Sequence, residues 1–586
     1  MPFVSKALSF LIFLGWIMAV QPVWSQSKLT TAFERSQGLE TATYEEGIAF
    51  FDSLANQHSS KLKFIELGYT DSGYPLLLAV LSVTGLFDPA ELRALGKTII
   101  LINNNIHPGE PDGVDASMLL FRDYLSKPEY EEMLQKVVVI CIPFYNVDGT
   151  LNRNSHSRAN QIGPLSYGFR GNALNLDLNR DFIKADSKNA RTFFEIFHTW
   201  KPDLYLEPHV TNGADYQHVM TYLLTQEDKL GGQLSRIARN SFAPFINRNM
   251  AEKGFQMCPY VNVWGTTPDK GMTQFLETPR YSSGYAALFQ TMGLVLESHM
   301  LKPFKQRVEA TYALLQESVL WASLHSSILR EARSADRDTL RKAQKLPISW
   351  QNDPKGFEEI TFLGYEGQYK KSAITGKERL FYNHTKPFAK KIPFYNRYVP
   401  SEVVIRPKSY IVSASWTKLI ELLEINRVKI EYLEKDSVLN VTSYYITDYK
   451  TVQQPYEGHY LHYQTKVRSE KQKILFKKGD IIIPTDQDAV RYVVETLEPS
   501  ATDSFFNWNF FDSILQQKEG FSDYVFEDIA EKLLVENNKL RNLLEKQKKK
   551  DPALAQDPLK QLDFIYRNSI YYEKSHNRYP VFRVEY

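Results

Sequence analysis

The chain has 586 residues, of which 43% are hydrophobic and 24% are charged. This composition supplies enough apolar surface for a folded core, and the length allows several domains, so a largely disordered protein is excluded. The 70 basic and 68 acidic residues leave a net charge of +2, which disfavours nucleic acid or an anionic membrane as the main partner. Two cysteines are too few for a disulfide scaffold or a four-cysteine zinc site.

The first 25 residues have the pattern of a secretory signal peptide. Lys6 precedes an apolar stretch at 7–20, and Ser25 offers a small residue at a cleavage point before Gln26. No later stretch is long and apolar enough to span a bilayer. We expect an exported protein, periplasmic or extracellular, without an integral membrane segment after cleavage. Retention of this segment as an anchor is the alternative.

From residue 26 to about 340, apolar stretches of strand length alternate with amphipathic helices. The expected strands are 76–82, 98–103, 137–142, 204–206 and 293–296, and the expected helices include 114–125 and 189–200. Strands that are apolar on both faces and separated by helices are typical of an α/β domain with a mixed central β-sheet flanked by helices. One long helix is expected from about Lys305 into the charged stretch 330–345, at the exit of this domain.

Beyond residue 346 the pattern changes to short alternating segments rich in Tyr, Val and Ile. We expect a β-rich α+β region over 346–586 with an accessory role and no second active site. Helices are expected at 416–423 and 524–550. The densely aromatic segment 504–511 is interpreted as core or domain interface.

A possible metal site lies in the segment NNNIHPGEPDG (103–113), directly after an expected strand. Loops that follow strand ends are where ligands collect in open α/β sheets. His107 and Glu110, three residues apart on a tight turn, can both reach one cation. Pro108 and Gly109 let that turn form without bulky side chains.

A third ligand is sought among the remaining histidines. His209 follows the strand-like stretch 203–206, so it also lies at the exit of a strand. His156, His218 and His299 compete with it, but none follows an apolar strand in this way. Among these histidines His209 best fits a third ligand, although on this evidence alone a hydrogen-bonded loop histidine is the favoured interpretation.

Two further segments carry polar groups suited to peptide chemistry. The stretch NALNLDLNRDF contains Asn179 and Arg180, whose amide and guanidinium groups are suited to a carboxylate. Asp177 can orient a metal-bound imidazole from behind. Glu297 closes the apolar strand 293–296, where a carboxylate costs desolvation unless it has a partner or a catalytic role. Near a metal-bound water, a raised pKa would make Glu297 a general base.

These motifs occur in an order that resembles the zinc carboxypeptidases of the M14 peptidase family, over roughly residues 26–333. The segment Asn146-Val147-Asp148-Gly149 is also similar to an Asn-Pro-Asp-Gly loop of that family, with Val147 in place of proline. The resemblance implies one Zn²⁺ per chain, held by His107, Glu110 and His209 with an open position for water. It also implies that Glu297 takes the proton from that water and passes it to the leaving amine.

The resemblance further implies a set of substrate contacts. Arg158 looks like the arginine that polarises the scissile carbonyl, and Arg170 is a competing candidate. Asn179 and Arg180 would hold the terminal carboxylate of the substrate. Tyr285 is favoured over Tyr281 as the mobile tyrosine of the family.

Two features leave substrate recognition open. Gly109 occupies a place where many digestive members of the family have an arginine, so one auxiliary substrate contact differs here. The residue that sets side-chain preference falls between Asn212 and Arg280, and basic, aromatic and aliphatic preferences all stay open.

The sequence therefore predicts an exported zinc metallocarboxypeptidase acting on a peptide or protein with a free C-terminal carboxylate. The predicted organisation is a signal peptide at 1–25, a catalytic domain at 26–340 and an accessory region at 346–586. One alternative is a zinc amidohydrolase of the same fold that acts on cell-wall peptides or acylated amino acids. Another is a catalytically inactive peptide-binding protein, which is disfavoured because the ligands and Glu297 are all present. The oligomeric state stays open.

Overall fold

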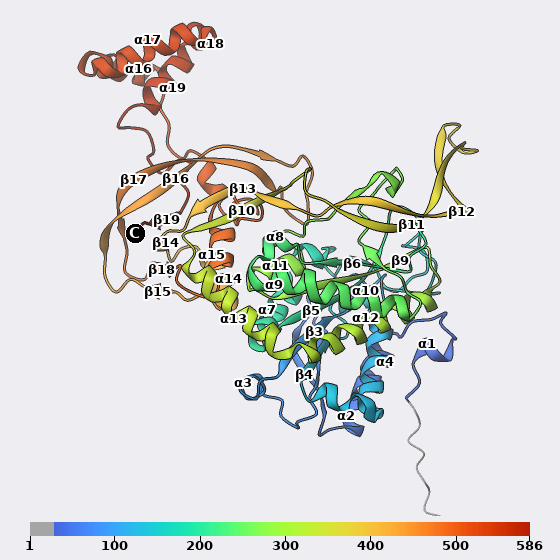
Figure 1. Ribbon diagram of the computed structural model, residues 1–586. Helices are drawn as coiled ribbons and strands as arrows, with labels where there is room; N and C mark the ends of the chain where they lie inside the picture. Colours follow the sequence, from blue (N-terminus) through green and yellow to red (C-terminus); the bar gives the residue numbers. More distant parts are fainter. Residues whose placement is uncertain (1–28) are drawn as a thin grey trace, which may run out of the picture.

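The computed structural model describes residues 29–586, so the predicted signal peptide lies outside the described residues. The first part of the chain is built on an eight-stranded mixed sheet with the order β1-β2-β4-β3-β5-β9-β6-β7 (Figure 1). Its strands are β1 (Leu62–Tyr69), β2 (Pro75–Leu81), β3 (Thr98–Asn103), β4 (Val137–Ile142), β5 (Leu204–Thr211), β6 (Met220–Leu224), β7 (Cys258–Pro259) and β9 (Met292–His299).

Four neighbouring strands, β4, β3, β5 and β9, run parallel. Every residue of β3, β4 and β5 is buried, which explains their nearly continuous apolar sequences. β4 lies on one side of β3 and β5 lies on the other, so the strand order reverses at β3. In open α/β sheets such a reversal leaves a crevice at the carboxyl ends of the strands.

Helices pack against this sheet and against one another. α4 (Asp112–Ser126) contacts both β5 and α12 (Phe304–Leu324), while α7 (Lys188–Trp200) packs on β1 and α11 (Ser282–Leu288) packs on β9. The predicted α/β class with a mixed central sheet is confirmed.

The prediction of one long helix after residue 305 is wrong. The chain forms α12 and then α13 (Ser326–Lys342), with a break at His325, whose φ of −115° and ψ of 21° are not helical. The His325 ring stacks on Trp321, and its Nδ1 lies 2.9 Å from the Trp321 carbonyl oxygen. A side chain that bonds to a backbone carbonyl competes with the helical hydrogen-bond pattern, which accounts for the break.

The second part of the chain is rich in strands, as predicted. β10 (Lys345–Asn352) pairs with β13 (Tyr398–Ile405), and β11 (Glu358–Lys371) and β12 (Glu378–Tyr395) form a long hairpin that extends away from the molecule (Figure 1). A six-stranded sheet has the order β15-β18-β14-β19-β16-β17. Its strands are β14 (Ser409–Val412), β15 (Glu431–Tyr432), β16 (Ser437–Thr451), β17 (His462–Phe476), β18 (Ile481–Pro484) and β19 (Val581–Val584).

Helices complete the second part. α14 (Thr417–Ile425) and α15 (Val490–Leu497) join the main core, whereas four further helices form a small group with a core of its own. Figure 1 shows this group standing apart from the rest. Its members are α16 (Asp523–Glu536), α17 (Asn538–Lys550), α18 (Pro552–Gln556) and α19 (Pro558–Arg567).

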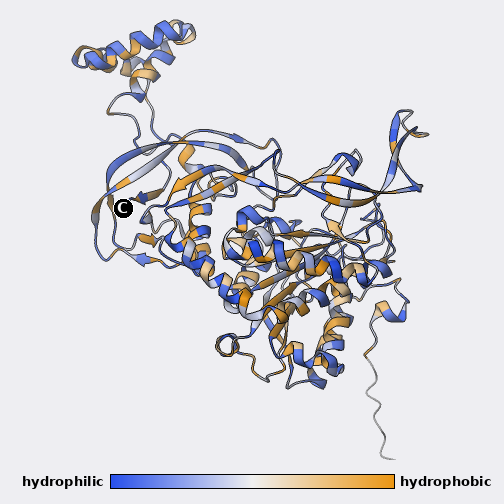
Figure 2. Ribbon diagram, in the orientation of Figure 1, coloured by the Kyte–Doolittle hydropathy of each residue, from blue (hydrophilic) through white to orange (hydrophobic). Residues whose placement is uncertain are grey.

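The two parts share one hydrophobic core, and Figure 2 shows the apolar residues concentrated in the central sheet and the helices beside it. β12 pairs in parallel with β8 (Met272–Thr273) of the first part. Phe289 of the first part stacks on Tyr492 of α15. Arg280 donates from its backbone N and its Nε to Asp503, at 3.0 and 2.7 Å. The predicted boundary between a catalytic domain and an accessory region at residues 340–346 stays a prediction, because one hydrophobic core extends across it.

Three smaller expectations can be compared with the structure. Four rings of the aromatic segment 504–511, those of Phe505, Phe506, Trp508 and Phe511, are fully buried, which agrees with a core position. Both cysteines are buried free thiols. Within residues 29–586, every helix is too short or too polar to cross a bilayer.

The shared core predicts that an ion pair between the two parts supports the stability of the whole chain. Asp503 is 1% exposed and the Arg280 side chain is 13% exposed, so Asp503→Ala would leave a mostly buried guanidinium without its partner. We expect a loss of about 3–5 kcal/mol in the free energy of unfolding, measured by urea denaturation. The matched control is Asp486→Ala, because the Asp486–Arg341 pair is exposed and should contribute less than about 1 kcal/mol. Equal effects of the two variants would contradict a shared core.

Candidate active site

The predicted ligands and the predicted base lie together at the carboxyl ends of the parallel strands. His107 and Glu110 are in the loop after β3, and His209 is in β5. Glu297 of β9 is the direct cross-strand partner of His209. Because directly paired residues of neighbouring strands point to the same face, the register of β5 and β9 places this imidazole and this carboxylate side by side. All four residues line one cavity of about 660 Å³.

The loop after β3 is held by a hydrogen-bonded asparagine and by close packing. Asn146 caps α6 (Val147–Leu151) with its side-chain oxygen, and its Nδ2 donates to the carbonyl oxygens of Ile106 and Arg170 at 3.4 and 3.0 Å. A Cβ at Gly109 would lie 2.4 Å from Arg158 Cδ. The missing side chain at Gly109 therefore makes room for Arg158, which occupies the space beside the turn.

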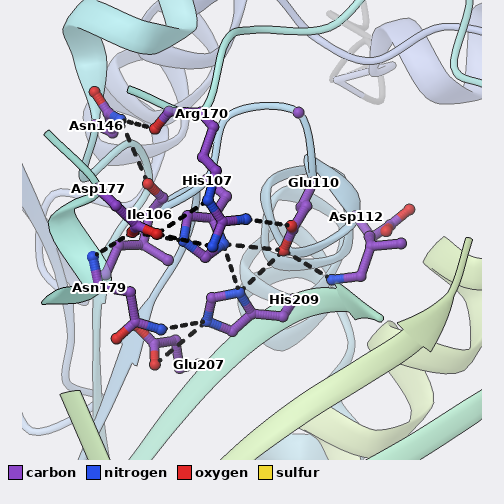
Figure 3. A network of polar contacts seen from close by, with 12 residues as sticks. Ile106, His107, Glu110, Asp112, Asn146, Arg170, Asp177, Asn179, Glu207 and His209 are labelled. Carbon is purple, nitrogen blue, oxygen red and sulfur yellow. Dashed lines mark hydrogen bonds and ion pairs between the residues drawn. The ribbon is translucent and has the colours of Figure 1, made fainter. Parts of the chain in front are cut away.

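Two imidazoles and one carboxylate converge on a single point. His107 Nδ1 and His209 Nδ1 are 3.1 Å apart, and Glu110 Oε2 lies 3.3 Å from the first and 3.0 Å from the second. Figure 3 shows the three side chains pointing toward one another. Within residues 29–586 these three form the one group of His, Cys, Asp or Glu residues with metal-site geometry.

The surroundings of both rings leave their converging nitrogens free to act as ligands. His107 Nε2 lies 2.9 Å from Asp177 Oδ1, and His209 Nε2 lies 3.4 Å from Glu207 Oε2 (Figure 3). A carboxylate only accepts hydrogen bonds, so each neutral ring carries its proton on Nε2 and directs the lone pair of Nδ1 inward. Three lone pairs that face one another need a cation between them. The donor set of two imidazoles and one carboxylate fits Zn²⁺.

The charges at the site shift the pKa values of two of these groups. Burial raises the pKa of Glu110, but Arg158 and His107 outweigh it and hold this pKa well below its usual range. Burial lowers the pKa of His209, but Glu110 and Glu207 outweigh it and hold this pKa well above its usual range. The metal-free site therefore favours a proton on His209, in the place where a metal cation would otherwise balance the carboxylates.

Glu297 lies beside the converging donors but is not one of them. Its Oε2 is buried and has no hydrogen-bond partner. Burial raises the pKa of Glu297 to about 8, and Glu110, Glu277 and Glu207 add to this against the opposing effect of His209. A buried carboxylate with a free oxygen in a cavity can accept a proton from a water molecule held there.

Both candidate arginines reach the site. Arg158 donates from Nη1 to Glu110 Oε1 at 2.8 Å. Arg170 donates from Nε to Asp177 Oδ2 at 3.0 Å, and its Nη1 lies 3.6 Å from Glu110 Oε1. Both side chains line the cavity. The geometry keeps both as candidates for polarising a carbonyl group.

Asn179 and Arg180 also line the cavity, on a short turn after Asp177, and Asn179 Nδ2 lies 3.4 Å from His209 Nε2. Asn179 Oδ1 accepts a hydrogen bond from the Ser282 backbone N at 3.1 Å. The Arg180 guanidinium lies over the ring of Tyr281, with its Cζ 4.3 Å from the ring centre. A neutral ring below Arg180 leaves its positive charge available to a carboxylate.

The structure does not bring Tyr285 to the site, and this corrects the preference for it over Tyr281. Tyr285 is fully buried in the core, where its hydroxyl donates to Asn426 Oδ1 at 2.6 Å and lies 2.9 Å from His198 Nε2. Tyr281 lines the cavity instead. The reason is the start of α11, which leaves Tyr281 at the N-cap facing the cavity and turns Tyr285 inward.

The competing histidines lie elsewhere. His156 is exposed, and His218 bonds the backbone of Gln256 and Leu363. His299 pairs with Asp215 at 3.4 Å. None of the three therefore joins the converging donors.

Sequence reasoning missed two acidic residues at the site. Glu207 lies behind His209, and Glu277 lines the cavity, where its pKa is raised to about 8 by burial and by Glu207. Glu207 lies two residues before His209 in β5, so the two side chains point to the same face of the strand. This spacing indicates that Glu207 is close to His209. Glu277 falls between Asn212 and Arg280, where the sequence predicts no individual site residue, and no local pattern marks it.

The chain is similar to known carboxypeptidases. It is 20% identical over 498 residues to carboxypeptidase 2 of Trichophyton rubrum, covering 80% of this chain and 84% of that protein. It is 21% identical over 434 residues to carboxypeptidase 2 of Trichophyton equinum, covering 70% and 73%. A solved metallo-carboxypeptidase from Burkholderia cenocepacia is 17% identical, covers 50% of this chain and 71% of its own, and has a TM-score of 0.36.

Residues 48–217 match the family model of the M14 peptidases, described as zinc carboxypeptidase. This segment belongs to the M14 peptidase family. The predicted family is confirmed, and with it the enzyme class, a metallocarboxypeptidase. The matched segment contains the three converging donors and the Asn179–Arg180 pair, while Glu297 lies beyond it.

The M14 site is expected to bind one zinc ion in competition with a proton. Because the pKa of His209 is raised in the metal-free protein, zinc must displace that proton. Below this pKa the apparent affinity should fall by about tenfold per pH unit, measured by chelator competition at several pH values. His209→Ala should lose stoichiometric zinc, whereas His156→Ala, at an exposed position, should keep it. An affinity that does not change with pH would contradict this account.

Proposed function

We propose that the protein is an exported, zinc-dependent metallocarboxypeptidase that hydrolyses the C-terminal peptide bond of its substrate. The observation that carries this proposal is one cavity that holds three converging ligand atoms, a carboxylate with a free oxygen and an arginine facing a neutral ring. The M14 match supports the reaction class. The signal-peptide pattern of residues 1–25 supports export.

His107, Glu110 and His209 would hold one Zn²⁺ per chain. When bound, this ion supplies a positive charge that polarises the scissile carbonyl and lowers the pKa of a water molecule. Asp177 fixes the orientation of His107 by accepting from its Nε2, and Glu207 does the same for His209 at a longer distance.

Glu297 would move the proton of the reaction. Its free Oε2 accepts a proton from the attacking water, and the same carboxyl group then donates it to the leaving amine. The base must be ionised for the first step. Its pKa of about 8 in the metal-free protein falls when a cation sits beside it. Activity is therefore expected to decrease as the pH is lowered through the resulting pKa.

Asn179 and Arg180 would hold the terminal carboxylate, with Tyr281 in place of Tyr285 as the neighbouring tyrosine. The Arg180 guanidinium can form two parallel hydrogen bonds to a carboxylate. These residues line the same cavity as the metal ligands. A substrate held by its terminal carboxylate therefore presents its last peptide bond to Glu297.

The first experiment tests the activity itself. Purified protein with zinc should release the C-terminal residue from a blocked dipeptide, lose this activity with a chelator, and leave the C-terminal amide of the same dipeptide largely intact. Zinc binding without dipeptide cleavage, together with cleavage of cell-wall stem peptides, would favour the amidohydrolase alternative. Peptide binding without any cleavage would favour the inactive binding protein.

Glu297→Gln should remove the base while it keeps the shape of the site. We expect kcat to fall by about a hundredfold to ten-thousandfold, the range typical of a lost general base. Zinc content should stay at one per chain, because Glu297 is not among the converging donors. Steady-state kinetics with elemental analysis measures both. An active variant, or one without zinc, would contradict the proposed role.

The arginine that polarises the carbonyl can be identified by comparing two variants. Arg158→Ala and Arg170→Ala each remove one guanidinium that lines the cavity. The variant that loses the polarising group should show a fall in kcat of about a hundredfold or more, because this interaction forms only in the transition state. The other variant should keep kcat within about tenfold. Two variants with nearly unchanged kcat would exclude both candidates.

A further inference from the structure

Glu277 is a buried carboxylate on the wall of the active-site cavity, and the steps proposed for Glu297 leave it without a task. It lies between β8 and α11, and only 9% of the residue is exposed. Its Oε2 accepts a hydrogen bond from the Ser283 hydroxyl. Within residues 29–586, no nitrogen of a Lys, Arg or His side chain lies within 4.0 Å of this carboxylate. A buried carboxylate without a cation beside it is unfavourable, so its place on a cavity wall indicates a positively charged ligand.

The positive groups that act on Glu277 from farther away have other partners. Lys229 Nζ donates to the backbone carbonyl oxygens of Glu277 and Gly284, at 3.0 and 3.5 Å, and does not reach the carboxylate. In the proposed site, Arg180 holds the terminal carboxylate of the substrate and His209 binds the metal. None of these groups is therefore available to pair with Glu277 when a substrate is bound.

A second acidic side chain, Glu207, makes this region more negative. The hydroxyl groups of Ser282 and Ser283, two consecutive residues of α11, donate to Glu207 and Glu277 respectively. Burial raises the pKa of Glu277 to about 8 in the metal-free protein, and repulsion from Glu207 adds to this. A cation beside Glu277 favours its ionised form and lowers this pKa. A positively charged ligand group would therefore both ionise this carboxyl group and pair with it.

The same cavity has apolar and aromatic walls. Leu223, Val295 and Phe275 line it. Val295 is paired with Leu223 and lies two residues before Glu297 in β9, so Val295 and Glu297 point to the same face of the sheet. The Phe275 ring packs edge-on against the ring of Tyr281, with 5.4 Å between their centres. Apolar walls together with one carboxylate suit a long side chain that has methylene groups and a charged end.

The second part of the chain holds the segment that carries Glu277. The Tyr398 hydroxyl donates to the backbone carbonyl oxygen of Gln274 at 2.6 Å. At the other end of the segment, Arg280 is paired with Asp503. The carboxylate is thus carried by a segment that is fixed on both sides. A group that is already in place loses little freedom when it binds a ligand, which favours selective binding.

We propose that Glu277 selects substrates whose C-terminal residue is lysine or arginine, by pairing with the positively charged end of that side chain. This inference rests on the proposed carboxypeptidase function and names the substrate class of the same site. Arg180 holds the terminal carboxylate, the apolar walls contact the methylene groups, and Glu277 binds the ammonium or guanidinium group.

Blocked dipeptides that differ only in the C-terminal residue test the proposal on the zinc-loaded wild-type protein. Lysine is compared with norleucine, which has a similar straight chain without the ammonium group. We expect kcat/KM to be about a hundredfold higher for lysine, because norleucine would bury the Glu277 carboxylate without a partner. Arginine should behave like lysine. Equal values for lysine and norleucine, or a preference for norleucine, would overturn the proposal.

Substitutions of Glu277 assign the preference to this residue. Glu277→Gln removes the charge and keeps the shape, so the ratio of kcat/KM for lysine to that for norleucine should fall by about a hundredfold. Glu277→Asp keeps the charge, and its ratio should stay above about ten. The matched control is Glu252→Gln, at an exposed position of α10 (Ala243–Glu252), which should keep the wild-type ratio. Thermal melts and zinc content should show that the variants are folded and loaded.

The outcomes distinguish this inference from the proposed function. If the wild-type protein cleaves only dipeptides with an apolar or acidic C-terminal residue, the proposed function stands and this inference is wrong. An equal loss of kcat/KM for lysine and norleucine in Glu277→Gln would also overturn the inference, because it would assign Glu277 a structural role. If the wild-type protein cleaves none of the dipeptides, the proposed function fails first and this inference fails with it.

Discussion

The parallel pairing of β5 with β9 is the constraint on which the active site depends. It sets His209 directly opposite Glu297, so that an imidazole and a carboxylate emerge side by side at the same edge of the sheet. The pairing of β3 with β5 adds the loop that carries His107 and Glu110 at the same edge. A shift of one residue between β5 and β9 would turn one of the two groups to the other face. Both faces of these buried strands are closely packed, so such a shift would disrupt their packing and is costly.

Most of the charges at this edge have a partner, whereas Glu297 Oε2 has none. Asp177 lies behind His107, Glu207 lies behind His209, and Glu110 lies between the two rings. The site nevertheless holds more carboxylates than fixed positive charges can balance. In the metal-free protein this excess raises the pKa of His209, and it adds to burial in raising the pKa values of Glu277 and Glu297. A metal ion at the converging donors would relieve this excess. The same arrangement therefore favours a cation beside the Glu297 carboxylate.

The second part of the chain is bound to the first by buried contacts of several kinds. A parallel strand pair, a stack of aromatic rings and the Arg280–Asp503 ion pair cross between them. Glu457, in the loop between β16 and β17, extends these contacts by accepting a hydrogen bond from the backbone N of Asp177. Residues 280 positions apart in sequence thus meet at Asp177, whose side chain contacts His107.

Local sequence patterns determined the α/β class, most strand positions and the converging metal-site residues, because each depends on a short apolar stretch and on the few residues directly after it. The tertiary structure decided the rest. Whether Tyr281 or Tyr285 faces the cavity depends on how α11 packs, since both lie in the same short motif. The break at His325 depends on a side chain that bonds the turn before it. The hydrogen bond from the Asp177 backbone to Glu457 depends on the folding of a distant hairpin onto the site, and no pattern within either segment records that long-range approach.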